Sequence, residues 1–311
     1  MSGKHGGSHP AASVGGQAVI EGVMMRGKRH WALACRRPDG VVSVHSEALK
    51  PLADRFPILK WPILRGIIAL WESMSLGIKT LGLSANESLG EEEHDITKKE
   101  MAVSLGIGIV MAVALFVVLP LFAAGSVRDW FPNSATFVLG EGLLRIGILV
   151  IYIAVVSRIK QLRRVFEYHG AEHKTIHALE AGLDLTPANV KQFSPVHPRC
   201  GTSFLLIVMV LAIAVFSFVG IPTLWLLVLS RLIGIPLIVG LSYEVIKYAG
   251  KHKDNTVMKV IMYPGLLLQK LTTREPDESQ IEVAIKALEG VAALEPIEMD
   301  HGGKADVEVM A

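Results

Sequence analysis

The chain has 311 residues, of which 51% are hydrophobic and 19% are charged, and its formal net charge is +2. Ordinary soluble domains carry about 25% charged residues, so this composition argues against that class and favours a membrane protein with the lipid bilayer as a partner. The basic residues border apolar segments and form no stripe, which argues against nucleic-acid binding. Two cysteines exclude a disulfide scaffold and favour a reducing compartment.

The first 50 residues predict a polar tail followed by a small sheet. Residues 1–14 are small and polar and are expected to be disordered. In residues 15–50, two extended segments flank the sequence RPDG at 37–40, which is a favoured hairpin turn. A further strand is expected over 18–25, interrupted by Gly22. This region therefore predicts a small cytoplasmic antiparallel β-sheet.

Residues 51–100 predict an interfacial amphipathic helix and a linker. Charged residues recur too often in the apolar stretch 57–84 for us to favour a spanning helix, which stays the alternative. We expect this stretch to lie on the bilayer surface. Residues 87–100 are strongly charged and predict a solvated connector. The charged residues of the apolar stretch are Lys60, Arg65, Glu72 and Lys79.

Residues 101–243 predict a transmembrane bundle. An apolar stretch of about 18 or more residues without charge is typical of a spanning helix. The short link at 220–222 predicts a tight turn between the last two spans, and one long kinked helix is the alternative. The four predicted spans cover roughly 102–124, 138–157, 203–219 and 222–241.

The loops between the spans predict the orientation of the protein. Lys and Arg number seven in residues 158–202 but one in residues 125–137. Because positively charged loops stay in the cytoplasm, we expect 158–202 and both termini to be cytoplasmic in a multi-pass protein. The N-terminus lacks the apolar core of a secretory signal.

Several charged residues in or near the spans are expected to be paired. Glu141 and Arg145 lie four residues apart and should neutralise each other. Arg231 lies within the fourth span, where a charge costs about 2.5–3.5 kcal/mol, so it should face the bundle interior or a water-filled cavity. Glu244 is a candidate partner or an additional metal ligand. Outside the spans, Glu21 is expected to point either to solvent or toward a metal site.

The cytoplasmic loop 158–202 concentrates metal-binding side chains. We expect a helix over 158–185 that continues the second span into the cytoplasm. On this helix His169 and His173, or His173 and His177, share a face. His169 and His177 are separated by about 12 Å along the helix axis and should not bind the same ion.

The sequence around these histidines matches a zinc-site pattern. His169, Glu172 and His173 form His-x-x-Glu-His, in which the histidines bind zinc and the glutamate is the base. His197 and Cys200 follow a proline-containing turn and can complete a tetrahedral site. Four protein ligands would close the site, whereas three and a water would leave it open for chemistry. The candidate ligands of a divalent metal, with zinc favoured, are His169, His173, His177, His197 and Cys200, and the candidate catalytic base is Glu172.

Other interpretations of the same residues stay open. The histidines can form a polar cytoplasmic face on which Lys174 neutralises Glu172. Cys200 can be a nucleophile with His197 as its base, activated by the N-terminus of the helix that it precedes. It can also be an inert residue at the membrane boundary.

The C-terminal region 244–294 predicts cytoplasmic amphipathic helices. Asp277 begins the sequence DESQ, which is typical of a capping box, and the apolar residues that follow share one face of a helix over 277–291. The acidic, glycine-containing tail 295–311 is expected to be disordered.

Four sequence blocks resemble the YqhQ-like family of bacterial membrane proteins. The blocks are GGQAVIEGVMMR at 15–26, HGAEHKTIH at 169–177, HPRCGTSF at 197–204 and TREPD at 273–277. The resemblance covers about residues 15–291. It implies a bacterial inner (plasma) membrane protein that depends on a metal, and it implies no particular reaction.

Together these features predict a mainly α-helical integral membrane protein with four transmembrane helices, a small N-terminal cytoplasmic β-sheet and amphipathic helices. The favoured function is metal-dependent hydrolysis of a membrane-associated substrate, a lipid or a peptide, at the cytoplasmic face. One alternative is a membrane scaffold, regulator or assembly factor that holds a structural metal and binds a protein partner. Another is a small transporter that uses Arg231 and Glu141 along a polar path.

Overall fold

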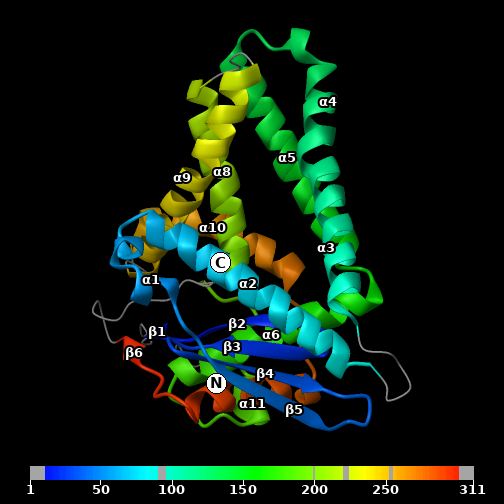
Figure 1. The fold of residues 1–311 in the computed structure, drawn as a ribbon, viewed down its shortest axis with the longest axis vertical. Coiled ribbons are helices and arrows are strands. Elements are labelled where there is room, and N and C mark those ends of the chain that lie inside the picture. The colour runs from blue at the N-terminus through cyan, green and yellow to red at the C-terminus, as the bar shows by residue number, and fades with distance from the viewer. Residues whose placement is uncertain (1–10, 90–95, 199, 220–223, 252–254, 301–311) are drawn as a thin grey trace, which may run out of the picture.

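The structure, a computed structural model, describes residues 11–89, 96–198, 200–219, 224–251 and 255–300. Within these ranges, four helices are long and apolar enough to cross a membrane. They stand together at one end of the molecule, and a small antiparallel sheet with its covering helices lies at the other end (Figure 1). The predicted class, mainly α-helical with a small N-terminal sheet, is confirmed.

The first candidate span contains a local change of helix type. It combines α3 (Lys98–Val113), a π-helical turn (Ala114–Val118) and α4 (Leu119–Gly125). The wider turn comes just before Pro120, which lacks an N–H group and whose ring would clash with a regular α-helix. The helix therefore accommodates the proline and continues to the far end of the bundle (Figure 1).

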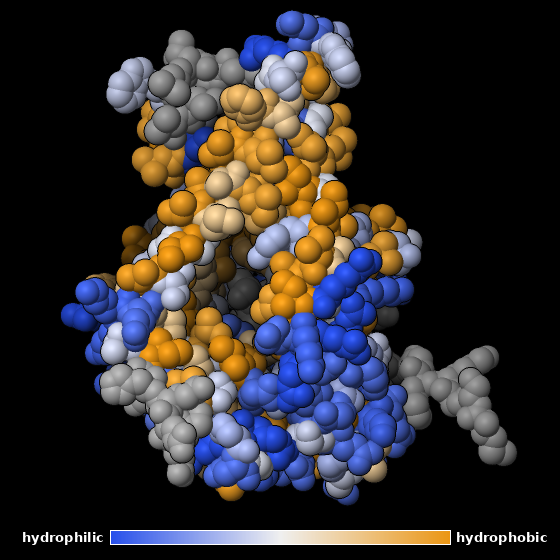
Figure 2. Space-filling view, turned by 90° about the vertical axis from the view of Figure 1, so that its right-hand side faces the viewer, coloured by the Kyte–Doolittle hydropathy of each residue, from blue (hydrophilic) through white to orange (hydrophobic). Residues whose placement is uncertain are grey.

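The other candidate spans belong to α5, α8 and α9. In α9 the apolar window is Leu229–Ala249, which begins later in the chain than expected. The predicted turn between the last two spans lies outside the described residues. Figure 2 shows a hydrophobic surface over the bundle and a hydrophilic surface at the opposite end. The elements, with the short helix η3 that precedes α5, are η3 (Arg128–Trp130), α5 (Ser134–Val156), α8 (Gly201–Val219) and α9 (Leu224–Lys251).

The N-terminal sheet is a four-stranded antiparallel meander in the order β2-β3-β4-β5. The hairpin predicted at 37–40 is confirmed, and Gly40 adopts a φ of 86° in its turn. The interrupted strand expected over 18–25 is instead two paired strands, because Glu21, with a φ of 49°, turns the chain before Gly22. The strands are β2 (Gly15–Val19), β3 (Gly22–Arg26), β4 (His30–Arg36) and β5 (Val42–Ala48).

Helices cover both faces of this sheet, which explains why β3 is buried throughout. Alternate residues of a strand point to opposite faces. Val23 and Met25 pack in the core formed with α6 (Lys160–Glu180) and α11 (Glu278–Ala292). Met24, on the other face, packs in the cluster that contains residues of α2.

Helix α2 (Leu64–Glu87) follows two short helices, α1 (Leu52–Arg55) and η1 (Pro57–Lys60), and crosses between the sheet and the bundle (Figure 1). Leu76 packs in the core between α2 and the sheet, whereas Trp71 is 65% exposed. This two-faced character agrees with an amphipathic helix. Among the described residues, α2 is outside the four candidate spans, and its position on the bilayer stays a prediction.

The helix expected over 158–185 is present over Lys160–Glu180, but the expectation that it continues the second span is wrong. Helix α5 ends at Val156, and α6 begins separately at Lys160. Ser157 caps the end of α5, and its hydroxyl bonds to the carbonyl oxygen of Ala154. The break lets α6 run along the sheet instead of extending the bundle axis (Figure 1).

The two terminal regions also differ from expectation where they are described. Disorder was expected over 1–14 and 295–311, but β1 (Ala11–Ala12) pairs antiparallel with β6 (Met299–Asp300).

The capping box at Asp277 is confirmed at the start of α11. The remaining helices are α7 (Pro187–Val190) and α10 (Thr256–Thr272).

Candidate metal centre

Helix α6 and the loop that follows α7 lie side by side and bring the candidate ligands together. The ring nitrogens of His173 and His177 contact the carbonyl oxygens of Pro195 and Val196, at 2.6 and 3.0 Å. The loop therefore runs along the histidine face of α6. It then delivers Cys200 to the same face, directly before the first residue of α8.

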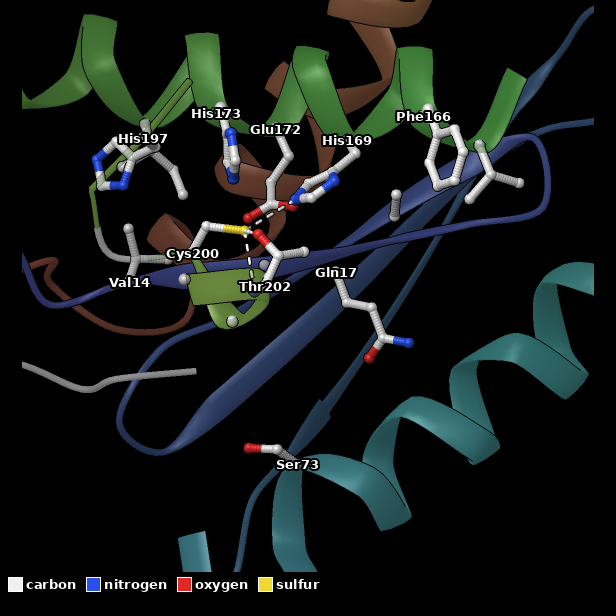
Figure 3. A pocket seen from close by; sticks show the side chains of 16 residues that line it. Val14, Gln17, Ser73, Phe166, His169, Glu172, His173, His197, Cys200 and Thr202 are labelled. Atoms are coloured by element: carbon white, nitrogen blue, oxygen red, sulfur yellow. Dashed lines mark hydrogen bonds between the residues drawn. The ribbon is translucent and has the colours of Figure 1, made fainter. Parts of the chain in front are cut away.

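His169, His173 and Cys200 form a compact group, called here the Cys200 cluster. One ligand atom from each residue lies within 4.8 Å of the others. The Nε2 atom of His169 is 3.2 Å from the Sγ atom of Cys200, and the two imidazole ring centres are 4.4 Å apart. Figure 3 shows both histidines projecting from α6 toward the sulfur. The structure thus brings together three of the five predicted ligands.

Backbone carbonyls set the tautomer of both histidines. The Nδ1 atom of His169 lies 2.8 Å from the carbonyl oxygen of Thr272, and Nδ1 of His173 lies 2.6 Å from that of Pro195. Because a carbonyl oxygen only accepts hydrogen bonds, each Nδ1 carries a proton, and in the neutral form of the ring the lone pair is then on Nε2. Burial lowers the pKa of His173 to about 4, so its imidazole is neutral. Neutral imidazoles held in this way are typical metal ligands.

The thiol of Cys200 is held by polar neighbours. The hydroxyl oxygen and backbone nitrogen of Thr202 lie 3.3 and 3.5 Å from Sγ. Burial raises the pKa of the Cys200 thiol, but its interactions with His173 and with Thr202 outweigh this and leave the pKa below its usual range. A lowered pKa favours the thiolate, which is the form that binds a metal.

Glu172 lies beside the cluster with an unsatisfied carboxylate oxygen. Its Oε2 atom is buried and has no hydrogen-bond partner among the described residues. Burial raises the pKa of Glu172 to about 8, and the backbone N–H of Gly16 opposes this rise. Glu172 and the Cys200 cluster line a cavity of about 240 Å³, and Gln17 and Ser73 also line it (Figure 3). A buried polar atom without a partner is rare and indicates a missing ligand or water.

The geometry of the Cys200 cluster fits a zinc ion. Tetrahedral zinc, with bonds of about 2.0–2.1 Å to nitrogen and 2.3 Å to sulfur, places these ligands about 3.5 Å apart. The observed separation of 3.2 Å between His169 Nε2 and Cys200 Sγ is close to this value. Two imidazoles and a thiol make a chemically suitable set, and the unpartnered oxygen of Glu172 lies next to it.

The remaining two predicted ligands, His177 and His197, lie in a different group. Together with Glu180 they form the Glu180 cluster, whose ligand atoms also lie within 4.8 Å of one another. His197 thus lies outside the group that contains Cys200, although both residues line the same cavity. Glu180 was not among the predicted ligands, although its position three residues after His177 on a helix places the two side chains on one face.

The other charged residues have structural partners. The carboxylate of Glu21 accepts two hydrogen bonds of 2.5 Å from Arg164 and is 27% exposed, so it is not among the metal ligands. Glu244 accepts hydrogen bonds from Arg65 at 2.7 and 2.5 Å, not from Arg231 as suggested. The pairing of Glu244 with Arg231 is therefore wrong, and both partners were missed because they come from segments distant in the sequence.

The charges within the bundle agree better with expectation. The predicted ion pair between Glu141 and Arg145 is present. The guanidinium group of Arg231 lies 3.5 Å from the ring centre of Phe216 on the neighbouring helix α8, so it faces into the bundle. A cation over an aromatic face offsets part of the cost of removing the charge from water.

The fold and the cluster define a class: an α+β membrane protein with a histidine–cysteine group where its bundle meets its sheet. A family model described as "Protein of unknown function (DUF1385)" matches residues 61–294, and the chain belongs to this family. It is 36% identical over 296 residues to the uncharacterized protein YqhQ of Bacillus subtilis (strain 168), which covers 91% of this chain and 93% of the relative. No solved structure matches the chain. The resemblance noted in the sequence blocks is thereby confirmed.

Proposed function

We propose that the protein holds a divalent metal, with zinc favoured, in the Cys200 cluster and hydrolyses a membrane-associated substrate. The ligands are His169, His173 and Cys200, and Glu172 is the general base. The observation that carries the proposal is the buried, unpartnered Oε2 of Glu172 beside three residues arranged as metal ligands. Three protein ligands leave a fourth position for a water molecule, which is typical of catalytic sites.

The placement of the cluster supports a substrate taken from the membrane. Cys200 directly precedes the third candidate span, Gly201–Phe218, so the cavity lies where the bundle begins. The cavity is also lined by Ser73 of the amphipathic helix α2. A lipid or a membrane-bound peptide can reach this position from the bilayer surface.

The proposed location is the cytoplasmic face of a bacterial plasma membrane. Ala12 and Met299, near the two ends of the chain, pair with each other beside the sheet. The first and last described residues therefore lie on one side of the bundle, which supports an even number of spans. The positively charged segment 158–202 lies on the same side, which favours the cytoplasm.

The chain's residues have distinct tasks in this proposal. A zinc ion would supply Lewis acidity and lower the pKa of a bound water to about 7. The carbonyls of Thr272 and Pro195 keep the Nε2 lone pairs of both histidines directed at the ion. Near a cation the carboxylate form of Glu172 is favoured, so Glu172 can accept the proton of the attacking water.

A hydrolytic metal site has a coordination position open to water, whereas a structural site does not. An experiment that tests for this open position distinguishes the two functions. The full chain in detergent is loaded with Co²⁺, which gives a visible absorption spectrum, and azide is then added. An open position predicts a change in the cobalt spectrum of the wild type and of Glu172→Gln. An unchanged wild-type spectrum with a response only in Glu172→Gln would mean that Glu172 closes the site, and the hydrolase proposal would be wrong.

A further inference from the structure

A cationic groove, called here the Arg29 groove, lies outside the Cys200 cluster and its cavity. The groove has a volume of about 460 Å³ and is formed by the turn between β3 and β4, by the link after β5 and by α1. Arg29, Lys50 and Arg55 line it, and Asp54 is the single acidic residue among the described residues that line it. The groove therefore carries a net positive charge.

The three cations are not neutralised within the described part of the protein. Their side chains are exposed, and no acidic side chain of the described residues forms an ion pair with them. The guanidinium group of Arg55 lies 5.3 Å from the ring centre of Phe56, and Asp54 pairs with Lys60 at 3.4 Å. Like charges that line one groove repel each other, and a bound anion offsets this repulsion.

Hydrogen bonds hold the walls of the groove together. The backbone N–H of Leu49 donates to the carbonyl oxygen of Arg29 at 2.6 Å, which joins the link after β5 to the turn between β3 and β4. The backbone N–H of Leu52 donates to Oε1 of Glu72 at 2.7 Å, which joins α1 to α2. Because the walls are fixed, a ligand loses less free energy to ordering them when it binds.

The chain that follows α1 contacts a candidate span directly. A Cβ atom at Gly240, within the window Leu229–Ala249 of α9, would lie 2.6 Å from the carbonyl oxygen of Ile63. A Cβ atom at Gly66, in the first turn of α2, would lie 2.6 Å from Cβ of Tyr243. Figure 1 shows α1 and the start of α2 at the foot of the bundle. The Arg29 groove therefore lies near the membrane boundary.

Large apolar side chains are exposed next to the groove. Phe56, Ile58 and Trp61, which follow α1, are 48%, 55% and 64% exposed. Exposed aromatic and aliphatic side chains beside cations are typical of a segment at the level of the lipid headgroups. The charge of the groove and these neighbours together match a molecule with an anionic head and an apolar tail.

We propose that the Arg29 groove binds the headgroup of an anionic phospholipid of the bilayer. Arg29, Lys50 and Arg55 attract the phosphate, and the apolar side chains after α1 contact the region where the acyl chains begin. This inference goes beyond the proposed hydrolysis, because it requires neither a bound metal nor a reaction at the Cys200 cluster.

The test is native mass spectrometry of the full chain in a neutral detergent. The protein is titrated with phosphatidylglycerol or with phosphatidylcholine that carries the same acyl chains. We expect phosphatidylglycerol to bind at least about tenfold more tightly, because it has a net negative charge and phosphatidylcholine does not. Equal affinities for the two lipids would overturn the proposal.

Substitution of the cations locates the site. Each of the variants Arg29→Gln, Lys50→Gln and Arg55→Gln should weaken the binding of phosphatidylglycerol about fivefold and leave that of phosphatidylcholine unchanged. Retention of the wild-type preference in all three variants would overturn the proposal.

Matched controls remove the same charge from exposed positions that do not line the groove, and they should bind phosphatidylglycerol as the wild type does. These controls are Arg37→Gln, Lys191→Gln and Lys286→Gln. If they weaken binding as much as the groove variants do, the net charge of the protein determines the affinity and the assigned site is wrong.

Inorganic phosphate distinguishes a lipid site from a site for a free anion. At the same concentration as the lipid, and with ionic strength held constant by chloride, phosphate should not displace phosphatidylglycerol. It lacks the acyl chains that contact the apolar side chains after α1. Displacement by phosphate under these conditions would overturn the assignment to a lipid.

Discussion

The Nδ1 atom of His173 donates a hydrogen bond of 2.6 Å to the carbonyl oxygen of Pro195. This contact joins the helix that carries two ligands to the loop that carries Cys200. It also turns the Nε2 lone pair of His173 toward the sulfur. The metal centre therefore depends on how the loop packs, and not only on which ligands the chain contains.

Gln269 is the side chain that should control this loop, because it is fully buried and bonds to both backbone groups of His197. Gln269→Leu would leave these groups unsatisfied, which costs about 1–3 kcal/mol. We expect a lower midpoint of chemical unfolding and weaker metal binding. Lys270→Leu, at the exposed neighbouring position, is the control. If the two variants bind zinc equally well, Gln269 does not position the loop.

Gly16 should be required for the position of Glu172. A Cβ atom at Gly16 would lie 2.8 Å from Cγ and Cδ of Glu172 and from the carbonyl oxygen of Met24. Gly16→Ala must therefore displace the strand or the carboxylate, at a cost of about 1–3 kcal/mol. Gly106→Ala, where a Cβ meets nothing within 4 Å, should be neutral. Thermal unfolding of both variants in detergent checks this, and equal midpoints would contradict the close contact.

The two cysteines should differ in reactivity. Burial raises the pKa of Cys35 to about 12, so this thiol stays protonated and unreactive at neutral pH. The Cys200 thiol, whose pKa is lowered, should react with maleimide in the metal-free protein. Zinc should protect it. Mass spectrometry after labelling locates the modified residue, and labelling of Cys200 at the same rate with and without zinc would argue against ligation.

The sequence predicted those parts of the fold that depend on local pattern. Uncharged apolar runs identify the spans, and the residues at 37–40 and at Asp277 specify a turn and a helix start whose chemistry is local. The end of α5 was missed because no proline or glycine marks Ser157. The turn at Glu21 was missed because a non-glycine residue rarely adopts a positive φ.

The candidate site was predictable only on the helix. Spacing of four residues places His169 and His173 on one face, which the structure shows. His197 and Cys200 lie in an irregular loop, where a separation of three residues does not determine direction. The structure places His197 beside Glu180. This position depends on how the loop packs on α6, which the sequence pattern does not show.

The ion pair between Lys174 and Glu275 should contribute more to the stability of the fold than the nearby pair between Lys191 and Glu278. Lys174 is 2% exposed and bonds to Glu275 and to the carbonyl oxygen of Lys191. Removing one partner of a fully buried ion pair lowers the free energy of unfolding by about 3–5 kcal/mol. Because Glu275 is 61% exposed, we expect a smaller loss of about 2 kcal/mol for Glu275→Ala. Glu278→Ala breaks an exposed pair with Lys191 and should cost less than about 1 kcal/mol. Chemical unfolding compares the two, and equal losses would contradict the burial of Lys174.

The exposed face of α2 should contact lipid. A variant that keeps Trp71 as its single tryptophan should lose fluorescence in bilayers of brominated lipid, because the ring is 65% exposed on an amphipathic helix. A matched variant that keeps only Trp31, which is 1% exposed within the sheet, should be quenched much less. Equal quenching of the two would place α2 away from the bilayer surface.

The most direct measurement of the central claim is the zinc content of the purified full chain. Elemental analysis should find bound zinc in the wild type and in His45→Ala, because His45 is exposed on the sheet, where it contacts Glu47 and Trp31. His173→Ala and Cys200→Ser should each contain at least one equivalent less. Equal zinc in all four proteins, or none in the wild type after zinc supplementation, would contradict a metal centre at the Cys200 cluster.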